Sequence, residues 1–217
     1  MSIVTPDGGL TALGYGLCGA AAILLFLSAS VAEKTARNRL STKQLAYCAM
    51  AMALSFVTSY IKLFSLPYGG SVSLMSMLFI CLIGNWYGIR VGIMTGLAYG
   101  ILQFLQEPYV LSLFQVCCDY VLAFAALGLA GFFAKSKNGL VKGYLLGVFG
   151  RGLFHAIGGY LYWMDYMPEN FPAALAQLYP IIYNYSYLLA EAAITLVVIS
   201  LPPVSKALGQ IKKSAIS

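Results

Sequence analysis

Charged residues are scarce in this chain. Lys, Arg, Asp and Glu together make up 9% of the 217 residues, whereas 60% of the residues are hydrophobic. Soluble domains usually carry about 25% charged residues, so this composition excludes water as the main solvent of the folded chain. A helix that spans a bilayer needs roughly 20 mostly apolar residues. The length therefore allows about six or seven spans and leaves little for a soluble domain.

The side chains that build metal centres and disulfide frameworks are also few. His155 is the only histidine, and none of the five cysteines forms a Cys-x-x-Cys pair. A single histidine excludes multi-histidine metal sites, and no activated nucleophile is evident. We therefore expect no metal and no cofactor. An intramembrane enzyme built on His155 and Asp119 is the least favoured interpretation, so we predict that the protein is not an enzyme.

Internal repeats are not evident either. Many secondary transporters are built from inverted repeats that leave a trace in the sequence. Their absence from the sequence argues against a stand-alone secondary transporter, which we keep as an alternative.

Seven hydrophobic segments follow one another along the chain. They cover residues 10–31, 45–64, 72–88, 91–106, 110–134, 140–163 and 178–203. The third and fourth segments are short and meet at a tight turn around Gly88 and Arg90, so we expect either to be tilted, bent or partly re-entrant. The pattern predicts an all-α integral membrane protein.

The first segment is predicted to be a transmembrane helix rather than a cleaved signal peptide. No Lys or Arg precedes it, and its apolar run is long for a signal. Four basic residues follow it, which favours a helix whose N-terminus lies outside the cell. These residues are Lys34, Arg37, Arg39 and Lys43.

The later charges agree with this orientation. Alternation of the spans places most basic residues and the C-terminus on the cytoplasmic side, as the positive-inside rule requires. The basic residues on that side are Arg90, Lys135, Lys137, Lys142, Lys206, Lys212 and Lys213. The acids near the predicted outer face are Asp7, Glu107, Asp119, Asp165 and Glu169. An acidic outer mouth would favour a cationic ligand.

Polar residues within or next to spans are costly and mark functional candidates. Four clusters fit this description, and all contain residues on the predicted outer side. They are the turn 66–73 with Tyr68 and paired glycines, residues 115–120 with Asp119, the stretch from Arg151 through His155 to Trp163, and residues 178–187 with four tyrosines and Asn184, followed by Glu191.

Each cluster taken alone also has a plain structural interpretation. Turns, interfacial aromatic belts and a packing histidine are common in membrane proteins. Their convergence on one side nevertheless predicts an outward-facing pocket that contains an acid and many aromatic rings. Such a pocket suits a small aromatic cation.

A separate feature lies in the second segment. Ala49 and Ala53, with Ala46 nearby, form a small-xxx-small pattern that lets another helix approach closely. The pattern alone does not distinguish a partner protein from packing within the chain.

Several runs of sequence together resemble the thiamine-specific substrate-binding (S) component of energy-coupling factor (ECF) vitamin transporters. The runs are 67–72 (PYGGSV), 115–120 (QVCCDY), 123–131 (AFAALGLAG), 151–155 (RGLFH) with Trp163, and 182–187 (IYNYSY), and their order matches from about Gln44 to Pro203. The resemblance implies six membrane helices around an outward-facing thiamine pocket in the plasma membrane. It also implies two kinds of partner, a transmembrane coupling protein and two cytoplasmic ATPases.

The resemblance divides the chain and assigns roles. Residues 44–217 would form the six-helix domain, and residues 1–43 would add an extra transmembrane helix with a basic cytoplasmic loop. The ligand-binding residues it implies are Asp119 as the pocket acid, Trp163 as the stacking ring, and Tyr120, Tyr109, His155, Tyr179, Asn184 and Tyr68 around them. Ala49 and Ala53 match the face that docks on the coupling protein.

Two departures and one alternative remain. The first segment is extra to the six-helix pattern, and the loop between Trp163 and Tyr179 is longer than usual. Because pocket residues rather than the fold decide the ligand, an S component for another vitamin, such as riboflavin or a thiamine precursor, is the main alternative.

Overall fold

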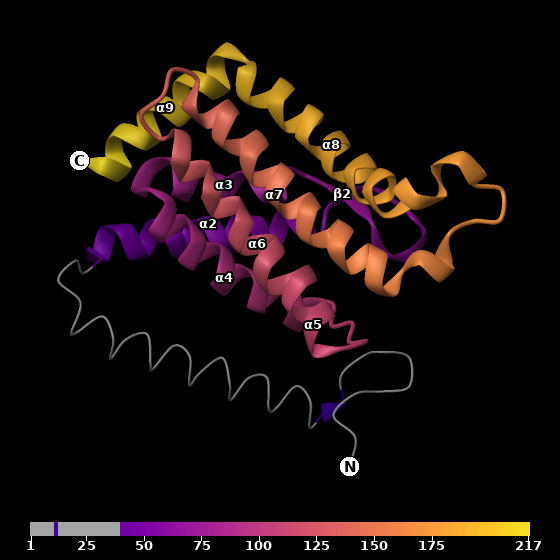
Figure 1. Ribbon diagram of the computed structural model, residues 1–217. Helices are drawn as coiled ribbons and strands as arrows, with labels where there is room; N and C mark the ends of the chain where they lie inside the picture. The colour runs from indigo at the N-terminus through magenta and orange to yellow at the C-terminus, as the bar shows by residue number, and fades with distance from the viewer. Residues whose placement is uncertain (1–10, 13–39) are drawn as a thin grey trace.

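The computed structural model describes residues 11–12 and 40–217, and within this part the helices run alongside one another as a bundle (Figure 1). Apart from residues 11–12, the helix expected over residues 10–31 lies outside the described residues, so the proposed division of the chain into residues 1–43 and 44–217 stays a prediction. Described helix α2 spans Thr42–Ser59 and begins at a complete capping box. The Ser41 hydroxyl accepts from the Gln44 amide at 3.2 Å, and the Gln44 side chain accepts from the Ser41 amide at 2.9 Å.

A short β-hairpin follows α2. Strand β1 (Lys62–Ser65) pairs antiparallel with β2 (Ser71–Ser73) across the 3₁₀ turn η1 (Pro67–Gly69). The expectation of one continuous span over 45–64 is therefore wrong at its end. Hydropathy does not distinguish an apolar strand from the last turn of a helix, and the turn after β1 uses Gly69 with φ +96°.

Helices α3 (Ser76–Tyr87) and α4 (Ile89–Gln106) meet at Gly88, which has φ +92°. The tight turn expected there is confirmed. Helix α3 has 12 residues and is about 18 Å long, too short to cross a hydrocarbon core of about 30 Å. It lies in the centre of the bundle, and Met77, Ile80 and Ile83 are fully buried.

The next helical run, Leu113–Phe133, changes its hydrogen-bond pattern three times. It consists of α5 (Leu113–Val116), the π-helical turn η2 (Cys117–Leu122), α6 (Ala123–Ala126) and the 3₁₀ stretch η3 (Leu127–Phe133). In the π turn, the Ala123 amide donates to the carbonyl of Cys118, five residues back. Such turns are frequent at functional sites.

Glycine allows this run to lie directly against α4. A Cβ placed on Gly128 would lie 2.2 Å from the backbone nitrogen of Ile93, a distance that no side chain can occupy. A Cβ on Gly100 would likewise lie 2.1 Å from the carbonyl oxygen of Tyr120. The two backbones are therefore in contact at both places, which holds the π turn against α4.

The last third of the chain begins with α7 (Gly139–Tyr162), the longest of the described helices. The short turns η4 (Met164–Tyr166) and η5 (Ala173–Leu178) lead from it into α8 (Tyr179–Ser200), and α9 (Pro202–Ile216) ends the chain. The predicted segment 178–203 is wrong at its C-terminal end. Leu201 is extended, with ψ 129°, because the residue before a proline avoids the helical region.

The surface is apolar and the interior is partly polar. Leu113, Phe132 and Val197 are 80%, 69% and 65% exposed, whereas Gln115 and Glu191 are buried. This inverted distribution suits a lipid environment. The runs Leu113–Phe133 and Ala173–Ser200 are also long and apolar enough to cross a bilayer. The predicted helical membrane fold is confirmed for the described residues, with the hairpin as an addition.

The two ends of the bundle differ in charge. At the end that we call the basic end, α9 contacts the start of α2 and the end of α3 (Figure 1). There Lys43 Nζ donates to Ser217 Oγ at 3.0 Å, and the Tyr87 hydroxyl donates to the Ala215 carbonyl at 3.1 Å. The other end, which we call the hairpin end, carries the β-hairpin and the connections 107–112 and 163–178.

Candidate functional site

A chain of hydrogen bonds joins the run 113–133 to α7 inside the bundle. Asp119, on the π turn, accepts from Gln115 Nε2 at 2.8 Å through Oδ2. Its other oxygen, Oδ1, lies 3.0 Å from Nδ1 of His155. The opposite ring nitrogen, Nε2, accepts from Arg151 Nε at 3.2 Å. The acid, histidine and arginine selected from the sequence therefore form one hydrogen-bonded chain, with His155 between the other two.

This arrangement determines which ring nitrogen of His155 carries the proton. An arginine can only donate, so Nε2 must be the unprotonated nitrogen, and Nδ1 carries the hydrogen that is donated to Asp119. The carboxylate thus faces two donors and keeps free lone pairs. The side chains of Asp119 and His155 are 17% and 13% exposed, which leaves both within reach of a ligand.

Glycines on α7 allow the carboxylate to come this close. A Cβ on Gly158 would lie 3.1 Å from Asp119 Oδ1, and one on Gly159 would lie 2.7 Å from the Pro180 side chain. The room that these glycines leave is therefore filled by neighbouring segments of the same chain.

Asn184, on α8, is attached to the same network. Its Nδ2 donates to the carbonyls of Pro180 at 2.8 Å and His155 at 3.3 Å. Its Oδ1 accepts from the Tyr187 hydroxyl at 2.9 Å. The asparagine is buried, so its orientation is held by contacts from two helices.

Aromatic rings lie at the hairpin end of the site. The Trp163 ring is 5.3 Å from that of Tyr109 and 5.1 Å from that of Tyr166, centroid to centroid. The Tyr179 hydroxyl donates to the Tyr166 carbonyl at 3.4 Å, and its ring contacts Phe171. Burial, followed by the neighbouring Tyr166, raises the pKa of Tyr109, so its hydroxyl remains a neutral donor. Tyr166 and Phe171 were not selected from the sequence, because aromatics in a long loop have no distinguishing pattern.

The hairpin lies against α8 and is fixed to it at two levels. At its tip, the Gly70 amide donates to the Tyr183 hydroxyl at 3.1 Å, and that hydroxyl donates to the Pro67 carbonyl. At its base, the buried carboxylate of Glu191 accepts from the Ser73 amide at 3.1 Å and the Ser73 hydroxyl at 2.7 Å. The same carboxylate accepts from the Met77 amide, at 3.2 Å, at the start of α3.

A small polar cavity of about 50 Å³ lies beneath the hairpin, between α2, α4, α7 and α8. Its polar lining comprises Ser59, Lys62, Ser71, Ser73, Ser76, Gln103, Gln106, Glu107, Arg151 and Glu191. Arg151 and Tyr187 also belong to the hydrogen-bond networks of His155 and Asn184, so the cavity adjoins the Asp119 network. Gln103 and Gln106 were missed, although amides in an apolar segment satisfy the criterion that selected the other clusters.

The remaining predicted residues lie elsewhere or are only partly described. The Tyr120 hydroxyl donates to the Glu107 carbonyl at 2.7 Å, and its ring lies 5.1 Å from that of Phe104, centroid to centroid. The side chain of Tyr68 lies outside the described residues. Ala49 and Ala53 are both exposed on α2, so they are not used for packing among the described helices.

These features define a multi-pass helical membrane protein with a polar, aromatic-lined site near one end. In the described part of the chain, no cluster of three or more metal-binding side chains occurs.

Comparison with known proteins identifies the family. Residues 45–209 match the family described as thiamine transporter protein (Thia_YuaJ). The chain belongs to this family, which confirms the resemblance drawn from the sequence motifs.

Two individual relatives support the same family assignment. The thiamine transporter ThiT of Bacillus subtilis (strain 168) is 33% identical over 156 residues, which cover 63% of this chain and 77% of the relative. A solved structure of ThiT from Listeria monocytogenes is 26% identical, with a TM-score of 0.65, over 76% of this chain and 96% of that one. Membership places the chain among plasma-membrane transport proteins rather than enzymes, as expected.

Proposed function

We propose that this protein is the thiamine-binding S component of an ECF-type, ATP-driven uptake transporter. The observation that carries the proposal is the Asp119 carboxylate, which is held by Gln115 and His155 at 2.8 and 3.0 Å within a family of thiamine transporters. Thiamine combines a cationic thiazolium ring with an aminopyrimidine ring. A partly buried carboxylate beside aromatic rings complements both its charge and its amino group.

The roles of the other residues follow from their positions. His155 and Trp163 lie eight residues apart along α7 and its cap, a rise of about 12 Å, so one ligand with two rings can extend from the acid to the tryptophan. Trp163 would stack on a ring, and Tyr109 would support it from the other side of the cluster. Asn184 and Tyr179 would fix the ligand's orientation, with Tyr120 and Tyr68 at the margin. The protein would do no chemistry on thiamine.

The proposed orientation places the hairpin end outside the cell and the basic end in the cytoplasm. The positive-inside rule supports it, because the basic end carries Lys43, Arg90 and the lysines of α9. With an additional span over residues 10–31, the N-terminus would lie outside and the C-terminus inside. We infer that residues 1–43 form this extra helix and its basic loop.

The proposed partners are a transmembrane coupling protein and two cytoplasmic ATPases. The exposed small side chains of Ala46, Ala49 and Ala53 on α2 support a docking face for a helix of the coupling protein. In this proposal, these partners would supply the energy for inward release.

Tryptophan fluorescence during a thiamine titration of the purified protein tests the ligand. The chain contains two tryptophans. Trp163 lies in the proposed site, whereas Trp86 lies at the basic end, edge-on to Tyr47 at 6.0 Å. Saturable quenching that is lost in Trp163→Phe and retained in the matched control Trp86→Phe is expected. An unchanged signal in wild-type protein, with no heat of binding by calorimetry, would exclude thiamine as the ligand.

A further inference from the structure

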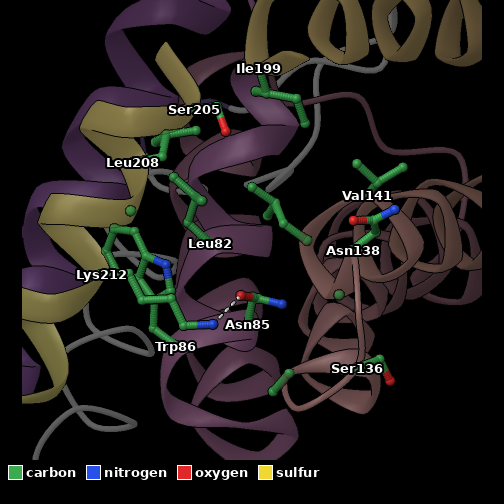
Figure 2. Close-up of a pocket in the computed structure, with 14 residues that line it drawn as sticks. Leu82, Asn85, Trp86, Ser136, Asn138, Val141, Ile199, Ser205, Leu208 and Lys212 are labelled. Carbon is green, nitrogen blue, oxygen red and sulfur yellow. Dashed lines mark hydrogen bonds between the residues drawn. The ribbon is translucent and has the colours of Figure 1, made fainter. Parts of the chain in front are cut away.

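A second and larger cavity lies at the basic end, remote from the thiamine site. It has a volume of about 280 Å³ and is bounded by the end of α3, residues 134–138, the start of α7, and α9. Figure 2 shows Asn85, Lys212, Ser136 and Ser205 around it, with Trp86 beside Lys212. None of the residues proposed to bind thiamine lines this cavity.

Asn85 brings an unused donor to the cavity. Its side chain is only 3% exposed, and its Oδ1 accepts from Lys212 Nζ at 2.9 Å. Because a lysine only donates, this contact fixes which end of the amide is the oxygen. The remaining Nδ2 has no hydrogen-bond partner among the described residues. A buried donor without a partner is costly, so an acceptor at this position would be stabilising.

The direction of that donor is also defined. In Figure 2 the Asn85 nitrogen points away from Lys212, toward the segment that carries Ser136 and Asn138. A Cβ on Gly139, the first residue of α7, would lie 3.6 Å from this nitrogen. The first amides of a helix have no acceptor within the helix, and the helix dipole makes this end positive. The amides of Gly139 and Lys142 already donate to the carbonyls of Ser136 and Asn138 at 3.0 and 3.1 Å. The donors that the start of α7 adds beside Nδ2 are therefore the amides of Leu140 and Val141, and both residues line the cavity.

The charged side chains around the cavity are all basic. Lys212 lines it, and the neighbouring connection and helices carry further basic residues, namely Lys135, Lys137, Lys142, Lys206 and Lys213. The acids of residues 40–217 all lie elsewhere, in the hairpin-end connections, on the π turn, or in the case of Glu191 against the hairpin. Within the described part of the chain, Lys212 therefore has no carboxylate partner.

We propose that this cavity is an anion site that binds a phosphate group, held by Lys212 Nζ, Asn85 Nδ2 and the N-terminus of α7. Helix N-termini combined with a lysine and neutral donors are a recurrent phosphate-binding arrangement. The hydroxyls of Ser136 and Ser205 also line the cavity and are available as further donors. Free inorganic phosphate and the headgroup of an anionic phospholipid share this chemistry, since the basic end would lie at the membrane surface.

Thermal unfolding of the full chain in neutral detergent tests the site. Inorganic phosphate and short-chain phosphatidylglycerol are the two probes, each compared with chloride at equal ionic strength. A ligand that binds only the folded state raises the midpoint, here by about 3 °C. A higher unfolding midpoint with phosphate alone identifies a free anion as the ligand, and one with the lipid alone identifies a headgroup. A higher midpoint with both probes supports a site for the phosphate group that they share. No rise with either probe overturns the proposal.

Variants locate the effect. The rise should be lost in Lys212→Gln, which removes the charge at the cavity, and in Asn85→Leu, which removes the donor. Lys213→Gln is the matched control, because it removes the same charge from the adjacent, exposed position and should keep the full rise. Equal loss in Lys213→Gln would show a general charge effect and overturn the site. If Asn85→Leu fails to fold, the comparison of Lys212→Gln with Lys213→Gln still tests whether phosphate binds at the cavity.

Thiamine titration of the same samples separates this proposal from the preceding one. Quenching through Trp163 should be unchanged in Lys212→Gln, since the thiamine site lies at the other end of the bundle. Loss of the phosphate effect with intact thiamine binding then reports on the basic end alone.

Discussion

Arg151 determines which nitrogen of His155 carries the proton, through one hydrogen bond of 3.2 Å from its Nε to the ring Nε2. The guanidinium also lies 4.2 Å from the centre of the Phe124 ring, so its position is held by stacking as well as by the bond. The histidine is thereby presented to Asp119 as a neutral donor. Although Arg151 does not touch Asp119 in this network, it positions the residue that does.

Replacement of Arg151 by Gln should therefore weaken thiamine binding by about tenfold, the usual effect of losing a hydrogen bond from a charged group. Calorimetric titration measures it. Arg90→Gln, an exposed arginine at the basic end, is the matched control and should bind normally. Wild-type affinity in Arg151→Gln would mean that the histidine needs no such positioning.

Asp119→Ala should reduce thiamine affinity by about 2–3 kcal/mol, because a partly buried, charge-assisted contact is lost. Asp165→Asn removes an exposed carboxylate from the same end of the bundle and should change affinity little. Fluorescence titration of both variants separates a specific contact from the general attraction of acids for a cation. Equal affinities in the two variants would remove Asp119 from the site.

Gly128→Ala should destabilise the protein by roughly 1–3 kcal/mol, since an added methyl meets the backbone of α4 rather than a flexible side chain. Gly209→Ala on α9 has nothing within 4 Å of the new carbon and should be neutral or stabilising by up to about 1 kcal/mol. Thermal unfolding midpoints in detergent compare the two. A midpoint for Gly128→Ala at or above that of wild type would contradict the close packing.

Glu191→Gln should loosen the hairpin, because an amide group would face donors where the carboxylate accepts from Ser73 and Met77. The expected loss of stability is about 1–3 kcal/mol, with faster amide hydrogen exchange over residues 71–77. Glu107→Gln breaks only the exposed ion pair with Lys62 and should cost no more than about 1 kcal/mol. Similar exchange in the two variants would indicate that Glu191 does not anchor the hairpin.

Ala49→Trp and Ala53→Trp should prevent co-purification with the coupling module while leaving thiamine binding unchanged, since a large ring blocks close helix approach. Ala193→Trp places the same ring at an exposed position on α8 and should not interfere. Association of both α2 variants at wild-type levels would place the docking face elsewhere.

Much of the helical pattern could be predicted from the sequence because apolar runs of about 20 residues report directly on membrane spans. The ends of the helices were harder to predict from the sequence. Residues 61–64 continue the apolar run of α2, so hydropathy extended the helix into β1. The amphipathic α9 was merged partly into the span before it, because the effect of Pro202 on Leu201 concerns backbone angles rather than hydropathy.

For the site, the sequence selected Asp119, His155 and Asn184 because polar residues in spans are rare and conspicuous. It did not indicate what they contact. Glu191 bonds Ser73 across 118 positions of sequence, and no local pattern links residues so far apart. Tyr166 likewise contacts Trp163 only because η4 turns the chain back at that point.

The double attachment of the hairpin to α8 makes its two edges unequal. Tyr183 secures the tip and Glu191 the base, and α8 is itself bonded to α7 through Asn184 and Tyr185. On the β1 side, in the described chain, Lys62 forms an ion pair with Glu107, and the two side chains are 35% and 70% exposed. An ion pair so open to water adds little stability, so the hairpin is held more firmly on the side that faces α8 than on the side of β1.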